Sequence, residues 1–135
     1  MIHDSRIKPG AVIKEFTDLK AWQEAHALVL LIYKATKLFP REELFGLSSQ
    51  MQRAAVSITS NIAEGFGRHG YKEKVQFYYL AQGSLTELKN QVIVSRDIGL
   101  LKPQQFSQIR EQLNSAHQLL QGLIRKSKTF VNRDS

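Results

Sequence analysis

Cysteine is absent from this sequence, and its absence excludes disulfide frameworks, thiolate zinc sites, iron–sulfur clusters and thiol nucleophiles together. A hydrophobic run long enough to cross a membrane is missing too, because the longest nearly apolar stretch, residues 25–33, covers about half of a bilayer span. The first residues also lack the apolar segment of a signal peptide. We therefore expect a cytoplasmic protein.

Acidic residues are scarce relative to basic ones. The 19 Lys and Arg against 12 Asp and Glu give a formal net charge of +7, and the isoelectric point is near 9.8. A composition that is 42% hydrophobic and 23% charged is ordinary for a globular domain and argues against intrinsic disorder. The 135 residues suit one domain whose core needs neither a disulfide nor a metal.

The period-two alternation of β-strands is not found along the chain. Apolar residues instead recur every three or four positions in four segments that breakers separate. This pattern predicts helices over residues 17–38, 47–65, 71–98 and 103–128. Because short loops join these segments, we predict an all-α fold, an antiparallel up-down-up-down four-helix bundle.

The predicted bundle occupies residues 17–130, between a flexible N-terminal arm at 1–16 and a C-terminal tail at 131–135. The arm mixes charged residues with a Pro-Gly pair and shows no sustained period. Thr17 and Asp18 are residue types that cap helices, so we place the start of the first helix there.

Two of the predicted helices carry more apolar residues than a single bundle can bury. The 17–38 segment has two interleaved apolar stripes, one beginning at Leu19 and one at Ala21, and the 71–98 segment is similarly rich. A contiguous surplus of this kind more often marks an interface, so we predict a homo-oligomer. The alternative is that the surplus side chains are scattered over the surface of a monomer.

Two stretches of the sequence are distinctive. The first runs from Arg53 to Gly65, reads RAAVSITSNIAEG and is followed by Arg68; the second runs from Ala81 to Leu88 and reads AQGSLTEL. Together they resemble the four-helix-bundle family first noticed as open reading frames within intervening sequences of 23S ribosomal RNA genes, the S23 ribosomal protein-like family. The accessory variability proteins of diversity-generating retroelements are similar at a greater distance.

The resemblance extends over residues 16–130, and the segments 16–22 and 39–47 also fit it. Thr59 stands where family members often carry proline, so a kink in the second helix is less expected here. The resemblance implies a homopentameric barrel of bundles and does not imply a known enzymatic activity. We expect no cofactor. In the retroelement relatives a basic surface engages nucleic acid and a reverse transcriptase, which implies DNA or RNA and such a polymerase as partners.

Basic residues gather at the junction of the second and third predicted helices and at the end of the fourth. These two places lie at the same end of an antiparallel bundle, so we expect a shared face that binds phosphates. The alternative is that the charges only keep the protein soluble, as a structural module that binds another protein. The predicted nucleic-acid contacts are Arg68, Lys72, Lys74, Arg125, Lys126 and Lys128.

Polar residues inside the two distinctive stretches admit two interpretations. We favour a buried hydrogen-bond network that sets helix register, with Glu64 paired to Arg53 or Arg68. The alternative is a catalytic pair of carboxylates, Glu64 and Glu87, with His69 as the acid or base. The residues of the predicted network are Arg53, Ser57, Asn61, Glu64, Ser84 and Glu87.

Metal-ligand spacing is absent, so no metal site is predicted. Residues 65–70 match the letters of a Gly-x-Gly-x-x-Gly dinucleotide loop, but a predicted helix and not a strand precedes them, so we interpret them as a helix-ending turn. The function we expect is a non-enzymatic nucleic-acid-binding or scaffolding accessory protein. The scattered histidines are His3, His26, His69 and His117.

Overall fold

A computed structural model describes residues 12–134, and within this range it contains helices and turns but no strand. The first eleven residues of the predicted arm lie outside the described part. The long helices are α1 (Lys20–Thr36), α2 (Leu47–Phe66), α3 (Tyr71–Asp97) and α4 (Pro103–Lys128). The short elements are the 3-10 turns η2 (Phe16–Asp18) and η3 (Arg41–Glu43) and the terminal helix α5 (Val131–Asp134).

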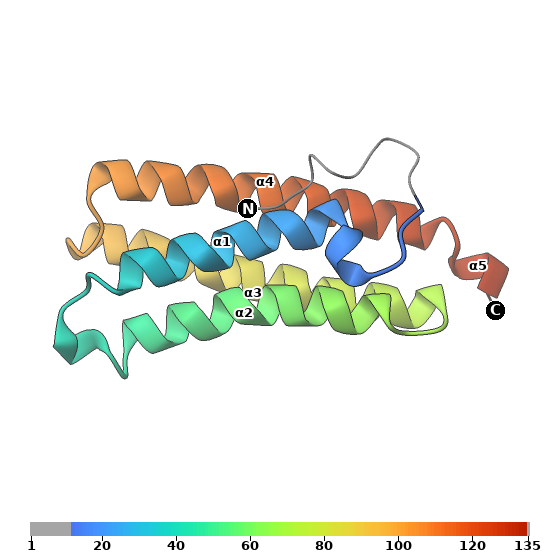
Figure 1. Ribbon diagram of the computed structural model, residues 1–135, viewed down its shortest axis with the longest axis horizontal. Helices are drawn as coiled ribbons and strands as arrows, with labels where there is room; N and C mark the ends of the chain where they lie inside the picture. Colours follow the sequence, from blue (N-terminus) through green and yellow to red (C-terminus); the bar gives the residue numbers. More distant parts are fainter. Residues whose placement is uncertain (1–11, 135) are drawn as a thin grey trace.

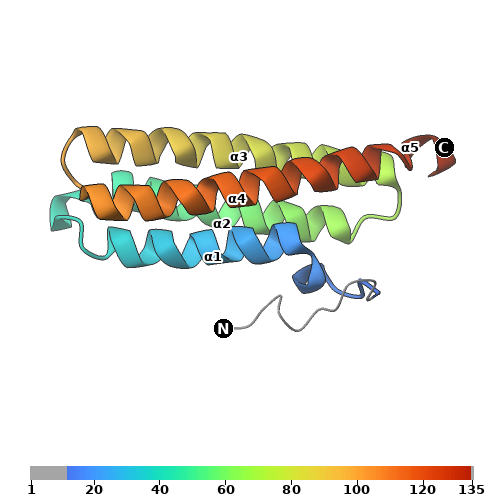
Figure 2. The same ribbon diagram turned by 90° about the horizontal axis from the view of Figure 1, so that it is seen from above.

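The four long helices form one elongated bundle in which successive helices run in opposite directions (Figure 1). The main contacts join α1 to α2, α2 to α3, α3 to α4 and α4 to α1, as the view from above also shows (Figure 2). This is the predicted all-α, antiparallel up-down-up-down arrangement. The junction of α2 with α3 lies at the same end as the last turns of α4, and the turn between α1 and α2 lies at the opposite end (Figure 1).

The first helix begins at Lys20, later than the predicted start at Thr17 and Asp18. The carboxylate of Asp18 turns back and accepts backbone N–H bonds from Glu15 and Lys14, both at 3.0 Å. These two bonds stabilise the charged carboxylate and lower the pKa of Asp18. The predicted cap therefore serves η2 instead, and Leu19 precedes α1 without a side-chain cap.

Each long helix turns an apolar stripe into the core. In α1 the stripe that begins at Ala21 is buried, whereas the side chains of the stripe that begins at Leu19 are mostly half-buried. In α4 the buried apolar residues recur at alternating steps of three and four from Phe106 to Leu120, after which the next residue of such a series, Leu123, is only half-buried and Ile124 faces the core instead. The shift follows because a straight α-helix drifts away from a strict 3.5-residue repeat.

The turn from α3 to α4 depends on Gly99, which has a φ of 84°. This left-handed conformation lets the N–H of Leu100 reach the carbonyl of Ser95 at 2.8 Å and satisfies the helix end. The fourth helix then begins with a proline, as predicted. The side-chain oxygen of Gln105 accepts the N–H of Lys102 at 2.9 Å.

Half-buried polar side chains link neighbouring helices. Glu24 of α1 accepts hydrogen bonds from two α4 side chains, Ser115 at 2.7 Å and Gln112 at 3.0 Å. The side-chain amide of Gln52 in α2 donates to the hydroxyl of Thr36 in α1 at 3.0 Å. Directional bonds of this kind favour one register between helices whose apolar faces alone could slide.

Candidate nucleic-acid interface

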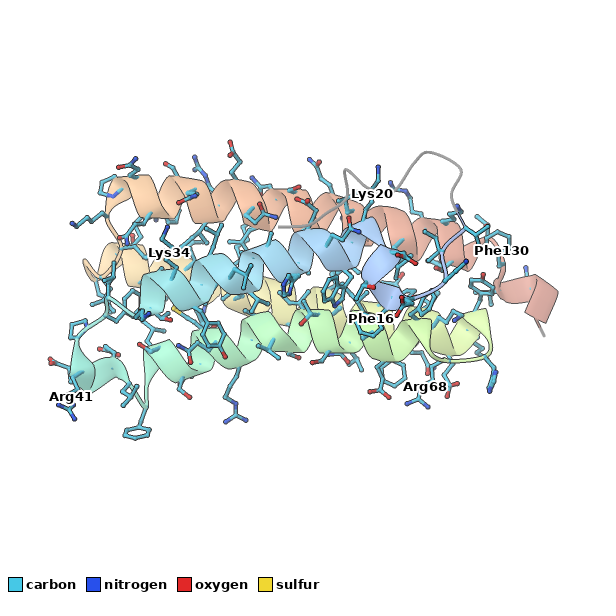
Figure 3. The ribbon with its side chains drawn as sticks, in the orientation of Figure 1. Phe16, Lys20, Lys34, Arg41, Arg68 and Phe130 are labelled. Atoms are coloured by element: carbon cyan, nitrogen blue, oxygen red, sulfur yellow. The ribbon has the colours of Figure 1, made fainter. Side chains whose placement is uncertain are left out.

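All six predicted phosphate contacts lie at one end of the bundle, where Figure 3 shows Arg68 near the end of α2 and Phe130 just beyond α4. The rings of Tyr71 and Phe130 lie 5.0 Å apart, and the ammonium group of Lys128 donates to the hydroxyl of Tyr79 at 3.2 Å. These contacts join the first half of α3 to the last turn of α4. We call this end the basic end, and its six cations are Arg68, Lys72, Lys74, Arg125, Lys126 and Lys128.

Four of these cations are exposed to solvent: Lys72, Arg125, Lys126 and Lys128. Lys72 and Tyr79 share one face of α3 because they are seven residues apart, and Arg125 and Lys128 share one face of α4. The contact between Lys128 and Tyr79 shows that these two faces adjoin. Lys72, Arg125 and Lys128 therefore form a cationic strip around the exposed ring of Tyr79. Sequence reasoning missed the ring, although the first turns of α3 contain both basic and aromatic residues.

The other two cations are engaged within the protein. Arg68 pairs with Glu64 at 2.9 Å, and its guanidinium lies 4.5 Å from the ring centre of Phe77. The ammonium group of Lys74 donates to the backbone carbonyl of Phe66 at 2.6 Å, at the C-terminus of α2. Carbonyls in the last turn of a helix have no partner inside the helix, so a cation there stabilises the helix end. These two side chains are therefore less free to reach phosphates.

The predicted polar network forms in part. The hydroxyls of Ser57 and Ser84 lie 2.8 Å apart across α2 and α3. The amide of Asn61 donates to the carbonyl of Ser57 at 2.9 Å and to its hydroxyl at 3.2 Å. These side chains are half-buried, so the network lies at the surface of the helix pair and not in the core. Of the two partners considered for Glu64, the structure selects Arg68.

The remaining network residues lie apart from this cluster. Glu87 accepts a long hydrogen bond from Gln91 of the same helix at 3.4 Å. Arg53 is exposed and lines an open pocket together with Glu87 and Ser57. The buried network predicted over all six residues is thus reduced to a link among three of them.

The two glutamates considered as a catalytic pair are far apart. Ser57 faces Ser84, and Glu64 follows the first by seven residues while Glu87 follows the second by three. In antiparallel helices these two offsets point in opposite directions, so ten residues at 1.5 Å each separate the glutamates by about 15 Å along the bundle. An acid–base pair on one substrate needs both groups within hydrogen-bond reach of it. The structure therefore does not assemble that pair.

The histidines also lie apart from one another. His26 stacks on Trp22 in α1, with ring centroids 4.7 Å apart and planes 11° from parallel, and His117 is half-buried in α4. His3 falls outside the described residues. Within residues 12–134 no group of three or more His, Cys, Asp or Glu side chains is arranged to hold a metal ion. In the same residues no helix has the length and apolarity that a membrane span requires.

The glycine-rich segment at 65–70 ends α2, as predicted. The N–H of Gly67 bonds to the carbonyl of Ala63 at 3.2 Å, and Gly70 precedes α3 in an extended conformation. A helix therefore stands on each side of this segment, whereas a dinucleotide loop follows a strand.

The comparisons with known proteins bear on the whole bundle. A family model described as 23S rRNA-intervening sequence protein matches residues 17–122. The chain belongs to this family. A crystal structure of a protein of unknown function from the S23 ribosomal protein family, from Bacteroides thetaiotaomicron, is similar with a TM-score of 0.72 and 18% identity, over 78% of this chain and 95% of that chain. At such identity the likeness shows the fold. No curated protein matches this chain.

In this 23S rRNA-intervening sequence protein the two distinctive stretches lie against each other on α2 and α3, where Ser57 meets Ser84. The match to the family ends at residue 122. Three cations of the basic end, Arg125, Lys126 and Lys128, follow it. An account of their role therefore depends on the features of this chain.

Proposed function

We propose that this protein is a non-enzymatic accessory protein that binds nucleic acid through the phosphate backbone at its basic end. The observation that carries the proposal is a strip of exposed cations that two helices bring together, Lys72 on α3 with Arg125 and Lys128 on α4, while the exposed Lys126 lies at the same end of the bundle on another face of α4. Cations that neutralise phosphates release counterions, which gives affinity that depends on salt and little on sequence. The net charge of +7 attracts a polyanion over a longer range.

Tyr79 supports a preference within this class of ligand. Its side chain is 45% exposed at the centre of the cationic strip, and an exposed aromatic ring offers a stacking surface to an unpaired base. A duplex keeps its bases stacked inside and would use only the cations. We therefore expect single-stranded nucleic acid to bind more tightly than duplex of the same length.

Self-association forms the second part of the proposal. Copies of the chain that assemble into a ring, a pentamer by resemblance, would multiply the basic end and hold a nucleic acid along several copies. A polymerase such as a reverse transcriptase is the kind of partner that such a scaffold would assist. The name of the family, which refers to 23S rRNA, agrees with a nucleic-acid context.

The test is fluorescence anisotropy with labelled single-stranded and duplex DNA and RNA over a series of salt concentrations. We expect log affinity to fall linearly with log salt. The variant Lys126→Glu with Lys128→Glu should bind at least tenfold more weakly at low salt, and its slope should be shallower by about one per lost phosphate contact.

The matched control is Lys89→Glu with Lys102→Glu, because both residues are exposed and neither belongs to the basic end. It changes the net charge by the same amount. Equal weakening by both variants would mean that only net charge matters and would overturn the assigned interface. Absence of binding at low salt would overturn the nucleic-acid role and leave a module that binds another protein.

A further inference from the structure

An open, mostly apolar groove of about 650 Å³ lies beside the turn between α1 and α2. Its apolar lining consists of Tyr33, Phe39, Pro40 and Leu44. A site of this size is in the range that small organic molecules occupy, about 300–1,000 Å³. Figure 3 shows Arg41, which also lines the groove, at the end of the bundle opposite Arg68. The groove is therefore separate from the basic end.

Cations without acidic partners surround the groove. Lys34, Lys37 and Arg41 line it, all three are exposed, and none of the residues that line it is acidic. None of the three forms an ion pair with a carboxylate in the part of the chain that the structure describes. The acids of η3, Glu42 and Glu43, are close in sequence but lie outside the lining. Apolar walls beside unpaired cations are complementary to a ligand that combines an apolar body with a negative charge.

The groove also reaches the start of α2, where hydrogen-bond donors lack acceptors. The carboxylate of Glu43 accepts the N–H of Leu47 only at 3.4 Å, and the preceding Gly46 provides no side-chain cap. Ser48 lines the groove although it is only 4% exposed. Within residues 12–134 its hydroxyl and its backbone N–H have no hydrogen-bond partner. A buried polar group without a partner is costly, whereas an anion at a helix N-terminus accepts such donors.

We propose that this groove binds a small carboxylic acid whose apolar body is about the size of an aromatic ring with a short chain. The body packs against the rings of Tyr33 and Phe39. The carboxylate lies between Ser48 and the charges of Lys37 and Arg41. A carboxylate suits the site better than a phosphate monoester, because a single charge loses less hydration than a double charge on entering a mostly apolar groove.

This inference goes beyond the proposed function. A site for a small acid at this end of the bundle needs neither nucleic acid nor a second copy of the chain. Its test uses a small probe alone, so its failure leaves the nucleic-acid role to the salt series described above.

The first test is a saturation-transfer difference NMR titration of the purified full chain with 4-phenylbutyrate as the probe. We expect a Kd of about 1 mM or tighter, as suits a probe with few atoms. The neutral 4-phenylbutan-1-ol and the ring-free butyrate should each bind about tenfold more weakly, and 4-phenylbutyl phosphate should bind no more tightly than the acid.

Three outcomes of this titration would overturn the proposal. Absence of binding up to about 10 mM would show that the groove holds no such ligand. Equal binding of the acid and the alcohol would show that the apolar walls alone hold the probe. Tighter binding of the phosphate would overturn the choice of a carboxylate.

The second test places the probe in the groove. Lys37→Glu with Arg41→Glu should weaken binding by about fivefold or more. Ser48→Ala should weaken it by about threefold and leave the fold unchanged in circular dichroism, because the hydroxyl has no bond within the described chain to lose.

The matched control is again Lys89→Glu with Lys102→Glu, which makes the same change in net charge outside the groove. It should bind the probe like the wild type. Equal weakening by both double variants would mean that only net charge matters and would overturn the site. Unchanged binding by Ser48→Ala together with the Lys37 and Arg41 variant would also overturn it, because the probe would then lie elsewhere.

Discussion

Tyr78 is the buried residue whose ionisation the fold opposes most clearly. Its side chain is 2% exposed, and burial, with a smaller contribution from nearby Tyr71, raises its pKa to about 12. In the unfolded chain a tyrosine ionises near 10. Between these values the unfolded state has lost a proton that the folded state keeps, so the free energy of unfolding falls as pH rises from about 10 to 12.

We expect this residue to account for a loss of about 2 kcal/mol across that window. The measurement is urea unfolding at pH 8 and pH 11 for the wild type and for Tyr78→Phe, which keeps the ring and removes the ionisable hydroxyl. The wild type should lose more stability than the variant. All other tyrosines and lysines are present in both proteins, so equal losses would contradict the assignment to Tyr78.

The hydrogen-bond partners of individual charged side chains could not be predicted from the sequence, because they depend on how the turns fold. The clustering of Lys74 with the other basic residues followed from helix order alone. Its bond to the carbonyl of Phe66 depends on how the intervening turn folds back across eight residues, and sequence spacing carries no such information. Asp18 shows the same limit, because either neighbouring turn could have used its carboxylate.

At the scale of the helices, α2 and α3 lie in close contact at Gly65. A Cβ atom on this buried residue would lie 2.7 Å from a ring carbon of Tyr78 and 2.9 Å from the Cβ of Phe77. Backbone-linked atoms cannot give way cheaply, so the helices would have to separate. The glycine therefore sets the spacing of the pair, together with the short bond between Ser57 and Ser84.

We predict that Gly65→Ala destabilises the protein by about 1–3 kcal/mol, although alanine is the better helix former. The matched control is Gly83→Ala on the exposed side of α3, where an added Cβ meets nothing within 4 Å. That variant should gain about 0.5–1 kcal/mol from helix propensity alone. Chemical denaturation measures both, and a stabilising Gly65→Ala would show that the helix pair tolerates a wider spacing.

At the scale of the whole molecule, periodicity predicted the four helices and their antiparallel order because each helix must bury one stripe. The surplus expected on α3 is present in part, because Val75, Leu85 and Val92 are buried whereas Tyr79, Leu80 and Val94 remain exposed. The exposure of Phe45, at 92%, could not be predicted from the sequence, because it depends on the conformation of a turn and not on helix period. The spacing of residues along the sequence does not show which exposed side chains would meet another copy, because that depends on the shape of the molecular surface.

The self-association proposed above should make thermal stability depend on protein concentration, since only folded copies associate and unfolded chains do not. For a chain of this size, each tenfold increase in concentration should raise the Tm of the wild type by about 4 °C while association is incomplete. Differential scanning fluorimetry over a hundredfold range of concentration measures this dependence. If the Tm of the wild type does not change over this range, and light scattering shows a monomer at every concentration, the bundle is stable as a monomer and the predicted self-association is wrong.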